Sequence, residues 1–264
     1  MKAIIIAGGL GTRLSKYTKD TPKGMLKFLG KSLIERQIDT LRDCGINDII
    51  IVRKHLKDKI NFSGIKYIDE NPDEDGNMLR GLFQAKSEFN DDIIMTYGDV
   101  IFQKSVMEKV IKTKCDVGVV VDKSWRSYWT ARLGSDTEDT ESLVLDAMKD
   151  NITRLGIPNP PQNELDARYV GILKFSKKVL PKMIDLYNEE QRKFWNSQEK
   201  WYQSRNFKKG YMTDWIQHLI NNKIKVKAIK ICHGWMEFDT NEDYELAIEW
   251  SENDKLKRFF DVDG

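Results

Sequence analysis

The segment Ala7-Gly8-Gly9-Leu10-Gly11-Thr12-Arg13 directly follows an apolar run and carries residue types that could bind a polyphosphate. Glycines let backbone N–H groups approach an anion closely. The guanidinium of Arg13 presents a rigid fork of donors to phosphate oxygens. For this segment alone, a glycine-rich turn with a surface arginine is the simpler interpretation.

Two familiar phosphate-binding motifs do not fit the chain. The dinucleotide fingerprint GxGxxG would need a third glycine where the chain has Leu14. The Walker A pattern matches Gly30-Lys31-Ser32 only at its end, because Met25 stands where that pattern needs its first glycine. Both motifs are therefore excluded.

Acidic residues stand at positions where a metal site could form. Asp99 follows the apolar run 93–97, and Glu237 and Asp239 lie two residues apart, so alternation in a strand would put them on one face. Mg²⁺ takes oxygen ligands, commonly one or two carboxylates with phosphates and water, and it neutralises charge when two anionic partners react. An aspartate after a strand is more often a turn residue, so position alone does not decide its role.

A second cationic segment, Thr21-Pro22-Lys23-Gly24, follows Arg13 closely. With it the chain matches GGxGTRL followed by PK, and here it resembles the nucleotidyltransferase family of sugar-phosphate and cytidylyl transferases. The resemblance implies an enzyme that uses Mg²⁺ as its cofactor. It also implies that Arg13 and Lys23 are catalytic and hold the triphosphate. The nucleotide would be bound by Ala7, Gly8, Gly9, Leu10, Gly11, Thr12 and Gly98, and the metal by Asp99, Asp239 and Glu237.

The segment Asp75-Gly76-Asn77-Met78 resembles that of cytidylyltransferases that activate phosphocholine or phosphonates. We therefore expect CTP as the nucleotide, with Asn77 near its base or ribose, although Asn77 would suit a helix N-cap equally well. The resemblance also places Arg132 near the acceptor and Arg168 in the wall of its pocket.

Two further residues are candidates for acceptor binding. Asp146 is one of several carboxylates that could pair with an amine, and Tyr211 is one of several aromatic residues that could surround a quaternary ammonium. Because Arg168 stands where an acidic residue would suit a cationic acceptor, we favour a phosphonate or polyol phosphate over phosphocholine.

The expected reaction transfers CMP from CTP to a small phosphonate or phosphate-monoester acceptor and releases pyrophosphate. The acceptor brings its own ionised oxygen, so no side-chain nucleophile is needed, and His55, His218 and His233 are expected to be structural. An alternative is a sugar-1-phosphate nucleotidyltransferase that uses UTP or dTTP. A nonenzymatic nucleotide sensor is disfavoured, because it would be expected to lack Lys23, Asp99 or Asp239, which are all present.

Apolar runs alternate with helical patterns in the first half of the chain. Ser32 and Glu35 match a capping box, and Gly45 suits the end of the helix that begins there. The alternation predicts an α/β fold with a Rossmann-like, mostly parallel mixed sheet flanked by helices. Its strands are expected at 2–7, 48–52, 65–68, 93–97 and 117–121, and further helices at 78–86 and 105–113.

The second half has a different pattern, which predicts an antiparallel acceptor-binding insertion. Pro158-Asn159-Pro160-Pro161 indicates a loop. Strands are expected at 129–133, 143–147, 168–175 and 225–231, and helices at 177–205 with a break, 211–221 and 241–257. The charged, aromatic stretch 189–209 would be a lid or an oligomer contact. We expect a single domain over 1–264, with a nucleotide-binding half 1–122, an acceptor-binding half 123–240 and a C-terminal helix in 241–264.

The bulk composition bounds the class of protein. The chain has 43 Lys and Arg and 41 Asp and Glu, a net charge of +2, so we expect no general attraction to nucleic acid or to a membrane. Cys44, Cys115 and Cys232 form no CxxC pair, which suits a reducing compartment. No apolar run approaches the ~18 residues that span a bilayer. We expect a cytoplasmic protein, with CTP and the acceptor as partners and a possible homodimer.

Overall fold

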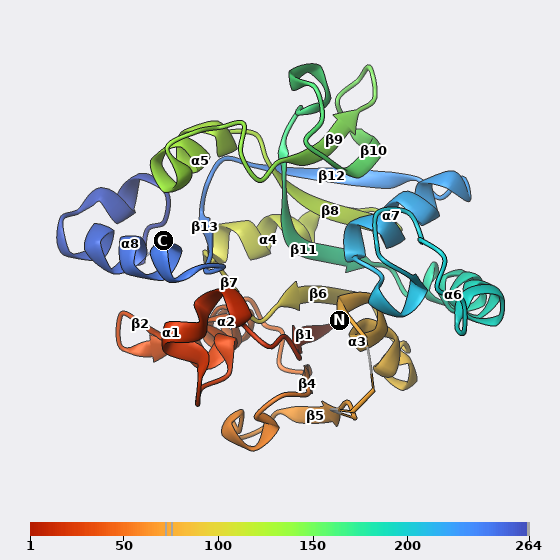
Figure 1. Ribbon diagram of the computed structural model, residues 1–264, viewed down its shortest axis with the longest axis horizontal. Coiled ribbons are helices and arrows are strands. Elements are labelled where there is room, and N and C mark those ends of the chain that lie inside the picture. Colours follow the sequence, from red (N-terminus) through yellow and green to blue (C-terminus); the bar gives the residue numbers. More distant parts are fainter. Residues whose placement is uncertain (72, 75, 263–264) are drawn as a thin grey trace.

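The computed structural model describes residues 1–71, 73–74 and 76–262. In this part of the chain, nine strands form one sheet in the order β5-β4-β1-β6-β11-β8-β12-β10-β9 (Figure 1). Strands β5, β4, β1 and β6 are parallel to one another, and β12 is parallel to β8. Strand β11 is antiparallel to both β6 and β8, and the β9–β10 hairpin adds antiparallel strands at one edge. The expected α/β fold with a mostly parallel mixed sheet is confirmed.

The elements have the following bounds. The large sheet consists of β1 (Lys2–Ala7), β4 (Ile49–Arg53), β5 (Lys66–Asp69), β6 (Ile93–Tyr97), β8 (Val117–Asp122), β9 (Glu141–Leu145), β10 (Asn151–Pro158), β11 (Arg168–Phe175) and β12 (Val226–Ile231). Two short antiparallel pairs join β2 (Lys27–Phe28) to β3 (Lys31–Ser32) and β7 (Val100–Phe102) to β13 (Trp235–Glu237). The helices are α1 (Ser15–Thr18), α2 (Leu33–Asp43), α3 (Met78–Gln84), α4 (Lys104–Lys112), α5 (Trp125–Leu133), α6 (Leu180–Phe194), α7 (Met212–Asn221) and α8 (Asn241–Glu252).

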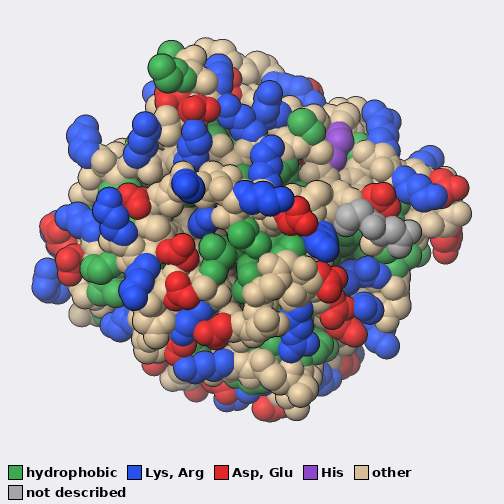
Figure 2. Space-filling view, turned by 180° about the vertical axis from the view of Figure 1, so that it is seen from behind, with side chains coloured by type: hydrophobic (Ala, Val, Ile, Leu, Met, Phe, Trp, Pro, Cys, Tyr) green, Lys and Arg blue, Asp and Glu red, His purple; other side chains and the backbone are tan. Residues whose placement is uncertain are grey.

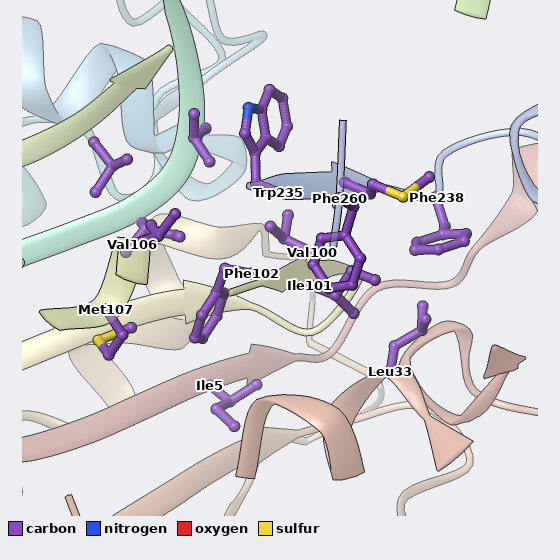
Figure 3. Close-up of a cluster of buried hydrophobic side chains, with 14 of the residues drawn as sticks. Ile5, Leu33, Val100, Ile101, Phe102, Val106, Met107, Trp235, Phe238 and Phe260 are labelled. Carbon is purple, nitrogen blue, oxygen red and sulfur yellow. The ribbon is translucent and has the colours of Figure 1, made fainter. Parts of the chain in front are cut away.

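Helices cover both faces of the sheet. Helices α2, α4, α5 and α8 contribute buried side chains to one hydrophobic cluster, and α3, α6 and α7 contribute to the other. Figure 3 shows Val100, Ile101 and Phe102 of β7 in the first cluster, with Trp235 and Phe238 beside them. All five are at most 2% exposed. The short β7–β13 pair is therefore fixed by core packing as well as by its ladder.

The predicted capping box is confirmed at the start of α2. The Ser32 hydroxyl accepts a hydrogen bond from the Glu35 backbone N–H at 3.1 Å, and the Glu35 carboxylate accepts one from the Ser32 N–H at 3.3 Å. At the other end, Gly45 has φ +81°, the left-handed conformation that commonly follows the last helical turn. Both ends of α2 were therefore predictable from single residues.

The prediction of a strand at 129–133 is wrong, because these residues belong to helix α5. Trp125, Tyr128 and Trp129 occupy positions i, i+3 and i+4 and are all at most 2% exposed, so they form the buried face of a helix. Gly134, with φ +76°, ends the helix in the left-handed conformation. The spacing of these buried aromatic residues is that of a helix and not the alternation of a strand.

Other boundaries in the second half also differ from expectation. Strand β10, from Asn151 to Pro158, was not predicted, and its last residue is the first of the expected proline loop. Helix α6 ends at Phe194, and no α-helix resumes between it and α7 in this fully described stretch. Helix α8 ends at Glu252 and is followed by a 3₁₀ turn at Lys255–Arg258 after the left-handed residue Asp254.

The surface carries both signs of charge. Figure 2 shows Lys and Arg side chains among Asp and Glu side chains across one face of the molecule. The three cysteines are free. Within the described ranges, no helix is both long enough and apolar enough to cross a membrane. Asp75, which belongs to the segment singled out in the sequence, lies outside the described residues.

Candidate active site

A cleft of about 720 Å³ opens where the parallel strands of the first half end. Its walls come from the turn after β1, the loop containing Lys23, the start of α3, the residues after β6 and the residues after β13. The predicted site residues that line it are Ala7, Gly8, Gly9, Leu10, Gly11, Thr12, Arg13, Lys23, Asn77, Gly98, Asp99 and Asp239. Segments more than 200 residues apart in the sequence thus meet around one cavity.

The β7–β13 pair brings the two predicted metal-binding aspartates together. Asp99 precedes β7 and Asp239 follows β13 by two residues, and Glu237 pairs with Val100 in this antiparallel ladder. The Phe238 N–H donates to the Asp99 carbonyl at 3.2 Å and continues the contact beyond the strands. Because the end of one antiparallel strand lies beside the start of its partner, the two carboxylates reach the same point.

The amino group of Lys23 lies between these carboxylates. Its Nζ is 2.5 Å from Asp99 Oδ2 and 2.6 Å from Asp239 Oδ1. Arg13 Nη2 lies 3.0 Å from the other oxygen, Oδ2, of Asp239. The Lys23 side chain is 14% exposed, whereas that of Arg13 is 62% exposed, so Arg13 reaches the carboxylate from the open side of the cleft.

Burial and charge oppose each other at this point. Burial alone would lower the pKa of Lys23, but the carboxylates of Asp99 and Asp239 outweigh it and raise that pKa above its usual value. Burial would likewise raise the pKa of Asp239, yet Lys23 and Arg13 hold it below the usual range. Lys23 and Asp239 are therefore both charged near neutral pH.

The two aspartates fit the ligand chemistry of Mg²⁺. Their oxygens already converge on one shared cation, and a pair of carboxylates completed by substrate phosphates and water is a common magnesium site. Among the described residues no group of three or more acidic, histidine or cysteine side chains could hold a metal by itself. The donor set thus suits an ion that is bound together with a nucleotide.

Glu237 and Arg132 form a separate ion pair beside this centre. The Arg132 guanidinium bonds to Glu237 and, through Nε and Nη2, to both oxygens of Asp243 at 2.5 and 2.7 Å. Its side chain is 3% exposed. Burial raises the pKa of Glu237, and Arg132 partly offsets that effect. Acceptor binding by Arg132 and metal binding by Glu237 stay predictions, and either would require this pair to rearrange.

Asp243 positions Asp239, which lies earlier in the chain. Its Oδ2 accepts from the backbone N–H groups of Asp239 at 3.0 Å and Thr240 at 2.9 Å, and its own N–H donates to the Thr240 hydroxyl. This is a capping box at the start of α8. The Thr240-x-x-Asp243 spacing could have revealed it in the sequence. Arg132 therefore supports Asp239 through Asp243.

The other predicted acceptor residues do not line the cleft as it is described. Arg168 stacks over the Trp129 ring at 4.1 Å and donates to the Asp139 carbonyl at 2.8 Å. Asp146 lies in the β9–β10 turn, where its carboxylate accepts from Asn151 and the Asp150 N–H. Tyr211 is the N-cap residue of α7 and is 45% exposed. Their acceptor-binding roles stay predictions.

Asn77 has the structural role that competed with nucleotide binding. It is the N-cap of α3, its Oδ1 accepts from the Met78 N–H at 2.9 Å, and its Nδ2 donates to the Lys209 carbonyl at 3.2 Å. Lys209 also lines the cleft. The end of the stretch 189–209 is therefore part of the cleft wall, and contact with the base or ribose stays a prediction for Asn77.

Sequence reasoning missed several cleft residues. Glu70, Lys54 and His55 line the wall on the side of β4 and β5. Glu70 directly follows β5, as Asp99 closely follows β6, so the same position at the carboxyl edge of the sheet could have indicated it. His55, which was expected to be structural, is exposed and lines the cleft, and its role stays a prediction.

Sequence comparisons connect this site with known proteins. Residues 3–200 match the model of the MobA-like NTP transferase domain. The chain is 34% identical to the CTP:phosphoglutamine cytidylyltransferase of Campylobacter jejuni over 260 residues, which cover 94% of this chain and all of that protein. It is 36% identical to the choline-phosphate cytidylyltransferase of Streptococcus pneumoniae over 148 residues, 54% of this chain and 64% of that relative.

The fold is also shared with a solved structure. The CTP:phosphocholine cytidylyltransferase from Streptococcus pneumoniae superposes with a TM-score of 0.71 over 94% of this chain and 97% of that one. The two are 21% identical in sequence, so this likeness concerns the fold alone.

Proposed function

Because the chain belongs to the family of MobA-like NTP transferase domains, and is thus a nucleotidyltransferase, we propose that it transfers CMP from CTP to a small phosphate-monoester or phosphonate acceptor. An ionised oxygen of the acceptor attacks the α-phosphorus of CTP and forms the new P–O bond. The bond from the α-phosphorus to the bridging oxygen breaks, and pyrophosphate leaves with the electron pair. No side chain needs to become covalently attached.

The residues of the cleft would act by binding and by charge. Arg13 and Lys23 would bind the triphosphate and stabilise the negative charge that develops as pyrophosphate leaves. The glycine-rich turn would offer backbone N–H groups to the phosphates. Asp99 and Asp239 would hold Mg²⁺, which when bound supplies positive charge to the phosphates.

One observation carries the proposal: Lys23 bridges Asp99 and Asp239 at the mouth of the glycine-rich turn. An ammonium held only for stability would gain little from two carboxylates that line an open cleft. A reaction between two anions, in contrast, needs cationic groups that bind the phosphates and carboxylates that can bind a metal ion, all at the same point. The preference for CTP is supported by the Campylobacter jejuni relative, which matches 94% of this chain and is named as a CTP:phosphoglutamine cytidylyltransferase.

The proposed class of acceptors is broader than the single acceptor in the name of either relative. The names of the two relatives give phosphoglutamine and choline phosphate as acceptors, and both molecules are small phosphorylated compounds. We therefore propose an acceptor of this size that bears a phosphate or a phosphonate. A carbohydrate phosphate paired with UTP or dTTP is the competing activity.

Release of pyrophosphate tests the proposal. The protein is incubated with CTP, UTP or dTTP, Mg²⁺ and a panel that includes phosphoglutamine, phosphocholine, an alkylphosphonate, a polyol phosphate and glucose-1-phosphate. We expect release only with Mg²⁺, fastest with CTP and a non-sugar acceptor. Faster release with UTP or dTTP and the sugar phosphate would favour the competing activity, and no release with any pair would contradict the proposal.

A further inference from the structure

A basic cavity lies at the ends of the strands that are opposite to the cleft. It has a volume of about 600 Å³ and is lined by residues just before β8, just before and at the start of β12, at the start of β10 and around the first turn of α6. Strands β6 and β8 are both antiparallel to β11, so their carboxyl ends point to the side where the cleft opens. Strand β8 is six residues long, which puts about 20 Å between the two sides. The basic cavity is therefore separate from the candidate active site.

Lysine side chains dominate the lining of the basic cavity. Six lysines and one aspartate line it, which is more net positive charge than the whole chain carries. Like charges that gather in a concave site repel one another and attract anions from solution. These residues are Lys114, Lys178, Lys182, Lys223, Lys225, Lys227 and Asp116.

Three of these lysines are not neutralised by the protein. Within the described ranges, Lys114, Lys182 and Lys223 form no ion pair. By comparison, Lys178 Nζ lies 3.7 Å from the Asp116 carboxylate, and Lys227 Nζ lies 3.0 Å from that of Asp150, outside the cavity lining. The basic cavity thus keeps ammonium groups that a ligand could neutralise.

The ends of the neighbouring helices do not account for this charge. Lys174 Nζ already donates to three carbonyls at the end of α4, at 2.8 to 3.0 Å, so Lys114, which follows that helix, is not needed there. Lys182 lies in the first turn of α6, where no acidic residue is present and a positive charge is unfavourable beside the N-terminal N–H groups. An anion in the cavity would make both positions favourable.

We propose that the basic cavity binds a small anion with two or more linked phosphates, such as inorganic triphosphate or the phosphate chain of a nucleotide. Linked phosphates place several negative charges in a small volume, and ammonium groups bind their oxygens through charge-assisted hydrogen bonds. A cavity of this volume is typical of small-molecule sites. The inference goes beyond the proposed function, because the described residues that line this cavity do not line the cleft.

Calorimetric titration with inorganic triphosphate in the absence of Mg²⁺ tests the proposal. The titrations use Lys23→Ala, which leaves two carboxylates at the centre of the cleft and so disfavours an anion there. In this background, Lys114→Gln/Lys182→Gln removes two charges from the basic cavity. The control Lys27→Gln/Lys104→Gln removes two charges from exposed lysines that line neither cavity. We expect the first pair to weaken binding at least about 10-fold, through lost charged hydrogen bonds, and the control pair to leave it nearly unchanged.

Equal weakening by the two pairs would mean a general attraction to positive charge and would overturn the site, as would the absence of triphosphate binding before either pair is introduced. Should Lys114→Gln/Lys182→Gln not fold, Lys223→Gln must weaken binding in its place. If Lys23→Ala does not fold, the same substitutions are compared in the wild-type protein.

The source of the phosphates is distinguished by titrations with CTP and CMP. Equal binding of CTP and triphosphate supports recognition of the phosphates alone, and tighter binding of CTP supports a nucleotide as the ligand. Binding of CMP as tight as that of triphosphate would contradict the need for linked phosphates. Binding of anionic vesicles or RNA through the same lysines, without binding of triphosphate, would overturn the proposal in favour of a macromolecular partner.

Discussion

Lys23 contacts both of the aspartates that are proposed to bind the metal. It neutralises Asp99 and Asp239 together, and its amino group would turn to the phosphates once a nucleotide enters. Arg13 is bonded to the same Asp239 but is mostly exposed, so it can follow the phosphates with less constraint. The two cations therefore differ in setting: Lys23 is held between the two carboxylates, and Arg13 reaches Asp239 from the open side of the cleft.

Removal of the Lys23 amino group should slow the reaction. We expect Lys23→Ala to lower kcat on the order of 10²-fold, because one preorganised donor at a developing charge contributes about that much. Lys19→Ala is the matched control, since Lys19 is an exposed lysine of the same loop region. Steady-state pyrophosphate release measures both variants, and circular dichroism checks that both are folded. Wild-type turnover in Lys23→Ala would contradict the catalytic role.

The two aspartates should be needed individually. Asp99→Asn and Asp239→Asn each remove a charged oxygen from the proposed metal site while keeping the size of the side chain, so we expect a loss of most turnover and a higher Mg²⁺ requirement. A magnesium titration of pyrophosphate release measures both effects. Glu242→Gln, an exposed acid three residues beyond Asp239, is the control. Full activity with an unchanged Mg²⁺ dependence in either aspartate variant would remove that residue from the metal site.

The loop before β2 is held close to the end of β6. A Cβ on Gly24 would stand 2.8 Å from the Gly98 carbonyl oxygen and 2.6 Å from Ile34 Cδ1. The glycine therefore allows the backbone next to Lys23 to approach the backbone next to Asp99. The distance between the cation and its carboxylate depends on this contact.

Gly24→Ala should misplace Lys23 without removing it. We expect a roughly 10- to 100-fold lower kcat, because small displacements of catalytic groups have effects of this size. Thermal unfolding measured beside the kinetics separates misplacement from a loss of stability. A variant that melts near the wild-type temperature and keeps full turnover would show that this contact is unimportant.

The capping box of α2 should matter for stability rather than for chemistry. Ser32→Ala removes the acceptor for the Glu35 N–H, so we expect about 1 kcal/mol lower free energy of unfolding in urea denaturation. Ser63→Ala, at an exposed position, should leave the free energy of unfolding unchanged. An equal effect of the two substitutions would mean that the cap contributes nothing.

The most accurate predictions from the sequence concern helix ends that are marked by single residues. Ser32, Glu35 and Gly45 marked both ends of α2 because capping depends on local chemistry. The stretch 129–133 was wrongly predicted to be a strand, because aromatic residues suit both strands and helices and only burial on one helical face decides between them. The partnership of Arg132 with Asp243 joins residues 111 positions apart, and no local pattern reports such a contact.

The cleft joins segments near the beginning of the chain to a segment near its end. Lys23 and Arg13 contact Asp239, and the residues around Asp99 pair with those before Asp239. The match to the family model ends at residue 200, whereas Asp239, which is bonded to Lys23 in the cleft, lies beyond that residue. Nucleotide binding should therefore stabilise the fold as a unit.

A thermal shift measures this coupling. With CTP and Mg²⁺ at about 100 times the dissociation constant, binding should add about 2.7 kcal/mol and raise the melting temperature by several degrees. Lys23→Ala should show a smaller shift at the same concentrations. An absent shift in the wild type at saturating CTP would argue against a nucleotide site that spans both ends of the chain.

The most direct measurement is a crystal structure of the protein with Mg²⁺ and a CTP analogue that cannot be cleaved. We predict that the triphosphate contacts the turn Gly8–Arg13 and Lys23, with the ion bound by Asp99 and Asp239. A triphosphate outside this cleft, or an ion held by other residues, would contradict the account.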